Sequence, residues 1–308
     1  MISINLHCSY FQQKEKSTLL VDKLNIPKGK LTVIVGESGS GKTTLLEVLA
    51  LMNNTLVEGS IISFFPDSLE KASEISSKID IFNLWKNKNA KTIANIRKWH
   101  FSFIFQDTKL MSNFDLHENI LLTQLIQEKN SKEASNLLSQ KIPEVRLEQI
   151  SLDKNPNALS GGEKQRAAFL RAVTPDYTVL FGDEPTGSLD EQNSRDIMKY
   201  LKNEVEKGKS VIIVSHNIDL AIEYADQIIA IEKTQPSKPN LIGKQNVFIK
   251  NQNKEKTWKT AGNQLVGNIK KDIRETIQSK EAKIEVKTFE NKKVLDTTFC
   301  QLFFKKEL

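Results

Sequence analysis

The stretch from Leu31 to Met52 restricts the possible folds of this 308-residue chain more than any other. Its first part, Leu31–Val35, is a short apolar run that predicts a buried strand, and Thr43–Met52 has the apolar spacing of a helix. Between them lies Gly36-Glu-Ser-Gly-Ser-Gly-Lys-Thr43, which fits the phosphate-loop pattern in full. A strand, a glycine-rich loop and a helix in this order predict an α/β fold with a parallel sheet.

The octet has the residue types that phosphate binding requires. Its glycines let the backbone turn tightly and direct several N–H groups at one point, where the positive end of the next helix dipole favours an anion. Lys42 is expected to reach the β- and γ-phosphates, and the Thr43 hydroxyl is expected to ligate Mg²⁺. A plain glycine-rich turn is the alternative, which the preceding apolar strand disfavours. The candidate nucleotide-binding residues here are Gly36, Glu37, Ser38, Gly39, Ser40, Gly41, Lys42, Thr43 and Thr44.

Further strands are expected over residues 101–105, 178–181 and 211–214, each followed by polar residues. One of these runs ends in Asp183 and Glu184. Beside a phosphate loop, Asp183 suits Mg²⁺ binding, and Glu184 suits the polarisation of an attacking water because a carboxylate can accept its proton. Ligands of open α/β sheets bind at the carboxyl ends of strands, so the residues after the four strands are expected to converge on one crevice.

The remaining patterns divide the chain. Two helical stretches, Leu116–Glu128 and Ser131–Lys141, predict a helical subdomain inserted between the second and third strands. Pro236 and Pro239 predict a linker that ends the core. Beyond it, residues 246–259 are rich in Asn and Lys, residues 269–277 favour a short helix, and residues 282–288 alternate like a strand.

Six motifs, taken in their order, resemble those of ATP-binding cassette (ABC) ATPases. They look like the family's Walker A, Q-loop, signature, Walker B, D-loop and switch histidine, and they are Gly36–Thr43, Gln106, Leu159–Arg166, Asp183–Glu184, Ser188–Asp190 and His216. The resemblance spans about residues 3–232. It implies an ABC ATPase domain at 1–234, with a mixed, mainly parallel sheet and a helical subdomain at about 107–175, followed by a basic C-terminal extension at 235–308. The stretch from Gly59 to Gln106 is longer than in the family, which indicates an insertion within Ser60–Ala90.

The resemblance also implies roles for single residues. Gln106 would sense Mg²⁺ and the γ-phosphate, and His216 would contact the γ-phosphate or the attacking water, beside Glu184 as the catalytic base. In the signature, Ser160, Gly161 and Gly162 would donate hydrogen bonds to the γ-phosphate bound by a second copy of the chain. Either Tyr10 or Phe11 would stack on adenine, although core packing is nearly as well supported for both.

Within the family, Asp183–Asp190 and Ile96–Gln106 are similar to the branch of lipoprotein-releasing, macrolide-exporting and cell-division ATPases. This resemblance implies an ATPase that uses ATP and Mg²⁺, forms a homodimer, and drives integral membrane permease subunits from the cytoplasmic, inner face of the membrane. The alternatives are a soluble ABC ATPase that acts on nucleic acid or ribosomes, and a regulatory module that binds ATP without turnover. Intact Gln106, Glu184 and His216 disfavour the second alternative.

Composition agrees with an intracellular protein. Cys8 and Cys300 are too few for a disulfide framework, and the start of the chain lacks the layout of a secretory signal. No apolar run approaches the length of about 18 residues that a membrane helix needs. Residues 235–308 contain 16 Lys and Arg against 8 Asp and Glu, a net charge of +8, which leaves −2 for residues 1–234 out of the total of +6. This basic tail is the single feature that favours a nucleic acid partner. We therefore expect that the partner is not a nucleic acid.

Overall fold

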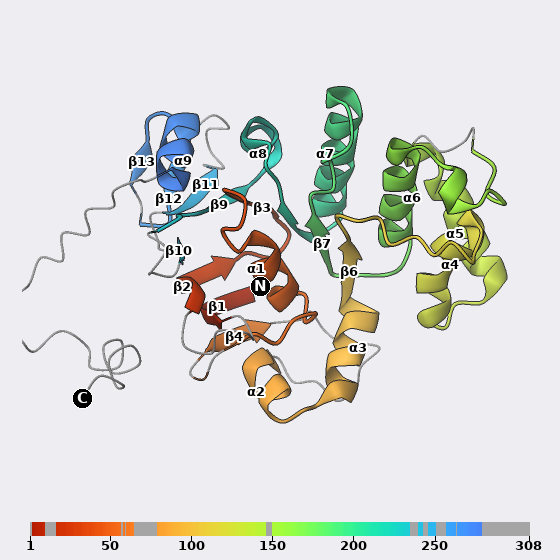
Figure 1. Cartoon of the computed structure of the whole chain (residues 1–308), viewed down its shortest axis with the longest axis horizontal. Coiled ribbons are helices and arrows are strands. Elements are labelled where there is room, and N and C mark those ends of the chain that lie inside the picture. Colours follow the sequence, from red (N-terminus) through yellow and green to blue (C-terminus); the bar gives the residue numbers. More distant parts are fainter. Residues whose placement is uncertain are drawn as a thin grey trace, which may run out of the picture.

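The computed structural model of the chain describes residues 2–9, 17–56, 58, 60–64, 79–145, 150–234, 240–242, 246–250, 257–262 and 264–278. Two sheets organise these residues, and helices cover the larger one on both faces (Figure 1). The larger sheet has eight strands in the order β13-β12-β11-β9-β3-β8-β7-β6, and the smaller sheet has five in the order β10-β2-β1-β4-β5.

Five neighbouring strands of the larger sheet are parallel. They are β3 (Leu31–Gly36), β6 (Phe101–Ile104), β7 (Val179–Asp183), β8 (Ser210–Val214) and β9 (Gln227–Ile231). Strands β3, β7, β8 and β9 are buried along their whole length, which explains their continuous apolar sequences, because a parallel sheet is covered on both faces. The four strands expected from the sequence are thereby confirmed, with ends within two residues of the expected ones.

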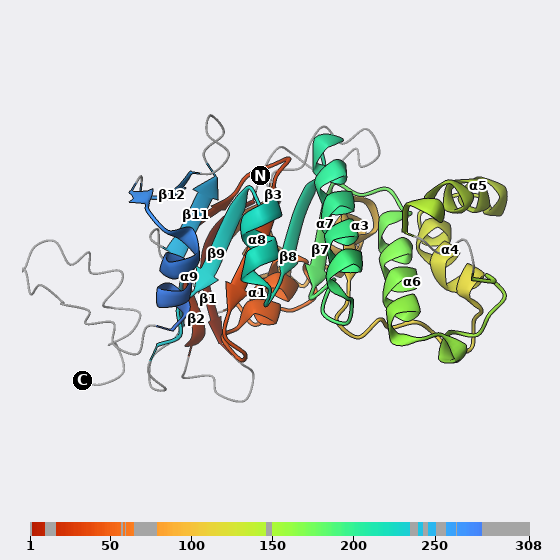
Figure 2. The same cartoon turned by 90° about the horizontal axis from the view of Figure 1, so that it is seen from above.

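The smaller sheet lies on one face of the larger one. Its strands are β1 (Ile2–Ser9), β2 (Ser17–Ile26), β4 (Ile61–Phe64), β5 (Ile79–Asp80) and β10 (Asn240–Ile242). It packs with α1 (Lys42–Leu49) around Ile34, Val214 and Ile229 of the larger sheet. The opposite face, with Val33, Ile213 and Ile228, is covered by α7 (Glu191–Glu206), α8 (Ile218–Tyr224) and α9 (Ile269–Ile277), as Figures 1 and 2 show.

A group of helices lies beyond β6 at one end of the molecule (Figures 1 and 2). It comprises α4 (Leu116–Ile126), α5 (Ser131–Lys141), the short 3-10 turns η1 (Pro143–Val145) and η2 (Pro156–Ala158), and α6 (Gly161–Val173). The preceding α2 (Ile81–Lys86) and α3 (Ala90–His100) lead into β6. These helices agree with the expected helical insertion between the second and third strands, and its limits at about 107–175 stay a prediction.

Two helices end earlier than the sequence pattern predicts. Helix α1 ends at Leu49 and not at Met52, because Leu51 has a φ of 59°, outside the helical region. Helix α4 ends at Ile126 and not at Glu128, whose φ is 64°. After α1 the apolar residues Ala50, Leu51 and Met52 continue the pattern past the last helical turn, so periodicity alone extends that helix too far.

The chain after residue 240 adds strands to both sheets. Strand β10 pairs in parallel with β2, and β11 (Val247–Lys250) pairs antiparallel with β9, followed by β12 (Trp258–Thr260) and β13 (Leu265–Val266). Helix α9 confirms the predicted short helix. The predicted linker prolines and the strand expected over 282–288 lie outside the described residues, and a domain boundary near residue 234 stays a prediction. No helix among the residues described above is long and apolar enough to span a bilayer.

Candidate active site

The parallel strands bring four sequence motifs to one edge of the sheet. Strands β3, β8, β7 and β6 are consecutive neighbours, so the segments that follow them leave the sheet side by side. These segments carry the phosphate loop, His216, the pair Asp183–Glu184 and Gln106. The four segments therefore leave the same edge of the sheet, as the parallel order of the strands requires, and their convergence on one ligand crevice stays a prediction.

The phosphate loop ends in a helix start that no side chain caps. Gly39 and Gly41 have φ values of 73° and 97°, which favour glycine over any residue with a side chain. Gly41 is the N-cap of α1, and no side chain caps this helix end. The first N–H groups of a helix have no partner within the helix, so an uncapped N-terminus at the sheet edge suits a phosphate.

Lys42 lies buried beneath the loop. Its Nζ donates hydrogen bonds to the carbonyl oxygens of Gly36 and Glu37, at 3.1 and 2.9 Å. Burial lowers the pKa of Lys42, while the negative charges of Glu184 and Asp183 act in the opposite direction. The ammonium group is thus held under the loop by weak acceptors that a phosphate oxygen can replace.

Thr43 and Asp183 meet between α1 and β7. The Thr43 hydroxyl donates to Asp183 Oδ1 at 3.2 Å, so that a hydroxyl and a carboxylate oxygen stand next to each other at the start of α1. Burial raises the pKa of Asp183, and the hydrogen bond from Thr43 counteracts this shift. Oxygen ligands of this kind suit Mg²⁺ shared with phosphates.

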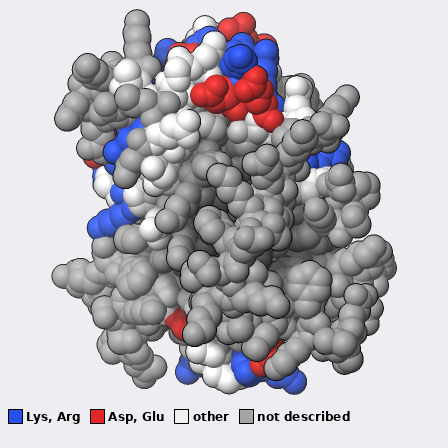
Figure 3. All heavy atoms as spheres, turned by 90° about the vertical axis from the view of Figure 1, so that its left-hand side faces the viewer, with Lys and Arg blue, Asp and Glu red and all other residues white. Residues whose placement is uncertain are grey.

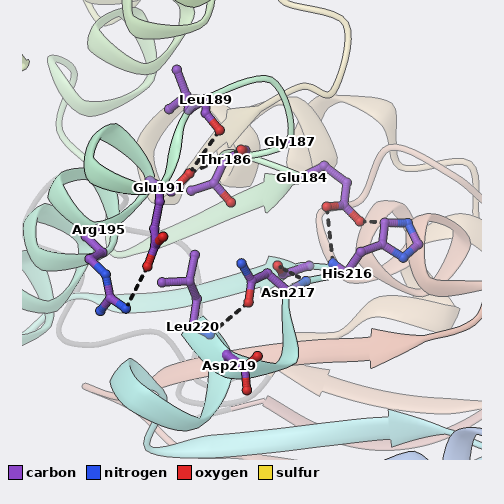
Figure 4. Close-up of a pocket in the computed structure, with 12 residues that line it drawn as sticks. Glu184, Thr186, Gly187, Leu189, Glu191, Arg195, His216, Asn217, Asp219 and Leu220 are labelled. Atoms are coloured by element: carbon purple, nitrogen blue, oxygen red, sulfur yellow. Dashed lines mark hydrogen bonds and ion pairs between the residues drawn. The ribbon is translucent and has the colours of Figure 1, made fainter.

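Glu184 faces His216 across the ends of β7 and β8 (Figure 4). Glu184 Oε1 lies 3.1 Å from His216 Nε2, and the His216 backbone N–H donates to Glu184 Oε2 at 3.3 Å. Burial raises the pKa of Glu184 to about 6, despite the opposing hydrogen bond from His216 and the charge of Lys42. Burial and the charge of Lys42 both lower the pKa of His216. At neutral pH this arrangement gives an ionised but basic carboxylate beside a neutral imidazole.

Backbone strain accompanies the candidate catalytic carboxylate, Glu184. Glu184 has a φ of 50°, and its N–H donates to the carbonyl of Val214 at 3.2 Å. Non-glycine residues in this region cost of order 1 kcal/mol and persist where the surroundings fix them. Glu184 and His216 both line a cavity of about 510 Å³ that continues along Thr186 and Leu189 toward α8 (Figure 4).

The role predicted for Gln106 and the candidate adenine contacts both stay predictions. Gln106 is exposed and follows β6, the neighbour of β7, so it stands beside the segment that carries Glu184. Just after it, the buried Arg171 of α6 donates to the carbonyls of Thr108 and Lys109, both at 2.7 Å. This contact ties the loop after Gln106 to the helical group. Tyr10 and Phe11 lie outside the described residues.

The signature residues form an exposed helix start. Ser160 is the N-cap of α6 and shares a capping box with Glu163, while Gly161 and Gly162 form the first turn. Figure 1 places α6 beyond β6 and β7 as seen from α1, and Figure 2 shows α6 beyond β7 as well. The signature therefore does not lie over the phosphate loop of its own chain.

Sequence reasoning missed Gln165, which joins the signature helix to the backbone of Glu184 and Pro185. Its Nε2 donates to the carbonyls of Glu184 and Pro185, at 3.3 and 2.8 Å, and its Oε1 accepts from the Ser188 hydroxyl at 2.5 Å. Its place inside the signature octet was visible in the sequence. Its buried contacts were not, because they join segments about 20 residues apart.

These features define a phosphate-loop nucleotide hydrolase, and comparisons with known proteins specify the class. The family model described as "ABC transporter" matches residues 21–187. The bacitracin export ATP-binding protein BceA of Halalkalibacterium halodurans is 35% identical over 233 residues, covering 75% of this chain and 84% of that protein. The lipoprotein-releasing system ATP-binding protein LolD of Wigglesworthia glossinidia brevipalpis is 33% identical, covering 77% of this chain and 96% of that protein.

Two solved structures of a similar cassette match the fold of this chain. The dimeric structure of MJ0796, a bacterial ABC transporter cassette, superposes with a TM-score of 0.64 at 28% identity, covering 74% of this chain and 93% of that one. A post-hydrolysis state of the same cassette, bound to ADP and Pi, also has a TM-score of 0.64. The chain belongs to the ABC transporter ATP-binding family, and it is an ATP-binding and ATP-hydrolysing cassette.

Proposed function

We propose that two copies of this chain close around two ATP molecules and thereby drive a separate membrane permease. The separation of the signature from the phosphate loop within one chain carries this proposal (Figure 2). Ser160, Gly161 and Gly162 form an exposed helix start at α6, where the helix dipole favours an anion, and the phosphate loop of the same chain does not lie opposite it. A two-fold arrangement would set this start against the partner's phosphate loop, and the dimeric structure of a similar cassette supports that arrangement.

For catalysis we propose that Thr43, Asp183 and Gln106 hold Mg²⁺ with the nucleotide. The ion, when bound, would neutralise charge on the β- and γ-phosphates. Lys42 stabilises the same phosphates from below the loop. Glu184 accepts the proton of the attacking water, for which it is suited because Oε1 is buried and receives no well-aligned hydrogen bond from any described residue. His216 orients that water and the γ-phosphate from the end of the neighbouring strand, β8.

A groove between the larger sheet and the helical group suits a permease segment. It has a volume of about 760 Å³ and is lined on one side by Phe101 and Phe103 and on the other by Ile126. Phe105 and Lys109, which flank Gln106 in the chain, also line it. Exposed apolar residues in a groove mark a protein contact. A permease segment bound in this groove would contact residues on both sides of Gln106, so a movement of Gln106 would change the contacts of that segment.

The permease would place the cassette at the inner face of the cell membrane. Similar proteins named as exporters and as a lipoprotein-releasing ATPase support this placement and the transport branch. The longer MacB of Chlorobaculum tepidum, of which this chain covers 29%, is named as a joint ATP-binding and permease protein.

The described part of the extension gives little support for nucleic acid as the partner. In α9, Lys270, Lys271 and Arg274 alternate with Asp272 and Glu275. Figure 3 looks at the side of the molecule that carries α9, and basic and acidic side chains stand together at its top. A mixed surface of this kind lacks the uniform basic patch that phosphate backbones attract.

The permease contact is testable at Ile126, whose side chain is 54% exposed in the groove. Ile126→Asp is expected to lower the fraction of tagged chain recovered with its host's membranes by about fivefold, since a buried charge opposes docking. ATP turnover by the isolated chain should stay within about twofold. Ile61→Asp is the matched control, because Ile61 is also 54% exposed but lies on β4, outside the groove. Equal membrane recovery of the two variants would refute the groove as the docking site.

A further inference from the structure

The phosphate loop is held from outside by residues that follow β9. The Asn240 side-chain amide donates from Nδ2 to the carbonyl oxygen of Ser40 at 3.1 Å. Its Oδ1 accepts the N–H of Thr234 at 3.1 Å, so the amide bridges the loop to the chain just after β9. Lys233 adds an ion pair with Glu37 of the loop, at 2.9 Å. None of these three contacts takes part in the chemistry proposed above.

Strand pairing fixes the position of Asn240. In β10, Asn240 pairs with Leu19 of β2. Leu19 itself lies against the loop, because a Cβ at Gly41 would come within 3.7 Å of the Leu19 Cβ. On the other side, a Cβ at Gly36 would come within 3.3 Å of Ile231, at the end of β9. The outer side of the loop is thus packed by three strand ends, and Asn240 supplies a directed hydrogen bond among them.

The hydrogen bond to Ser40 has a geometric consequence. The Ser40 carbonyl and the Gly41 N–H belong to one peptide plane, and in a trans peptide they point in opposite directions. No cis peptide occurs in the described residues. Because Asn240 holds the carbonyl toward β10, the Gly41 N–H points away from β10, to the inner side of the loop. Gly41 tolerates either sign of φ, so its own backbone does little to prevent this peptide from flipping.

We propose that Asn240 is a positioning residue for nucleotide binding, which orients the Gly41 N–H toward the nucleotide phosphates by holding the Ser40 carbonyl. The inference rests on the proposed function of the loop as the ATP site. It extends that site to Lys233, Thr234 and Asn240, which follow the six motifs in the chain. Asn240 acts only through the peptide it holds, so its loss should affect nucleotide affinity and leave the chemical step intact.

The test compares ATP binding and turnover in the full chain. Asn240→Ala is expected to raise the dissociation constant for ATP and the KM about five- to tenfold, with kcat changed less than about twofold, since one charge-assisted hydrogen bond to phosphate is weakened. ADP affinity should fall by the same factor, because the loop N–H groups contact phosphates that both nucleotides have. Asn240→Asp should have at least as large an effect, since it keeps the acceptor for Thr234 and loses the donor for Ser40.

Asn246→Ala is the matched control. The substitution removes the hydrogen bond that Asn246 donates to Glu232, at 3.3 Å. Asn246 lies six residues after Asn240, and this hydrogen bond does not involve the phosphate loop. The ATP affinity of Asn246→Ala should stay within about twofold of wild type.

Unchanged ATP affinity in Asn240→Ala, beside a wild-type chain that binds ATP, would overturn this inference alone. A loss of kcat in Asn240→Ala with an unchanged KM would also overturn it. A wild-type chain that binds no ATP would instead overturn the proposed function, and the inference with it.

Discussion

Replacing Glu184 by glutamine is expected to lower ATP turnover by at least about 100-fold, because the amide cannot accept the proton of the attacking water. We propose Glu184 as the base because its Oε1 is buried beside His216 and burial raises its pKa to about 6. The same pKa predicts that kcat of the wild-type chain rises with pH and is half-maximal at about pH 6 or above, because nearby phosphates raise the pKa further. Steady-state phosphate release between pH 5 and 8 checks both statements.

The Glu184→Gln chain should still fold and bind ATP. Burial disfavours the charged form of Glu184, so a neutral side chain of the same shape is expected to cost no stability at pH 7. Glu191→Gln is a suitable control, since Glu191 is another carboxylate that lines the same cavity, and its turnover should stay within about twofold of wild type. Turnover in Glu184→Gln close to that of the control would show that another group is the base.

Replacing Glu204 by alanine is expected to destabilise the fold by about 2–4 kcal/mol. Glu204 is fully buried in α7, where it accepts hydrogen bonds from Tyr177 at 2.7 Å, Lys207 at 2.8 Å and Lys209 at 2.6 Å. Removing it leaves the buried Tyr177 hydroxyl without an acceptor, whereas the partly exposed lysines regain water. The free energy of unfolding from urea titration measures the effect. Glu206→Ala, on the exposed face of the same helix, should change stability by less than about 0.5 kcal/mol.

Low pH should remove the contribution of Glu204 to the free energy of unfolding. Burial alone would raise its pKa, but the hydrogen bonds from Lys207, Lys209 and Tyr177 outweigh burial and lower the pKa to about 2 from an ordinary value of 4.5. A carboxylate with a lowered pKa in the folded state stabilises the fold above about pH 4.5, and this stabilisation is lost as the pH falls toward 2. The stability difference between wild type and Glu204→Gln should therefore shrink between pH 5 and 3. A constant difference would mean that the charge of Glu204 is not what matters.

The sequence predicts the parallel core well for a physical reason. Strands such as β3 and β8 are buried on both faces, so their apolar runs are continuous and their ends are marked by Gly36 and by the polar Ser215 and His216. The strands after residue 240 were not predicted. They lie at the edge of the sheet, where β11 and β12 bury only residues such as Val247, Phe248 and Trp258 within an Asn- and Lys-rich stretch.

The residues of the candidate site also fall into two groups, those that the sequence predicts and those that it does not. Residues that must touch phosphate or water, such as Lys42, Asp183 and Glu184, lie in short motifs whose chemistry can be read locally. Residues that hold those motifs in place are not visible locally, because their contacts join distant parts of the chain. Gln165 and Arg171 act across the helical group, and Asn240 reaches the phosphate loop from 200 residues away. Only the folded structure identifies such partners.

The most direct test of the central claim mixes two inactive chains. Lys42→Ala removes the phosphate contact but leaves the signature, while Ser160→Arg blocks the signature but leaves the phosphate loop. If each ATP site combines the loop of one copy with the signature of the other, a mixed dimer has one intact site. Equal amounts of the two chains should then recover up to about a quarter of wild-type ATP turnover, since half of the dimers are mixed and each has one of two sites. Turnover no greater than the sum of the two variants assayed separately, in a mixture shown to contain mixed dimers, would contradict the account.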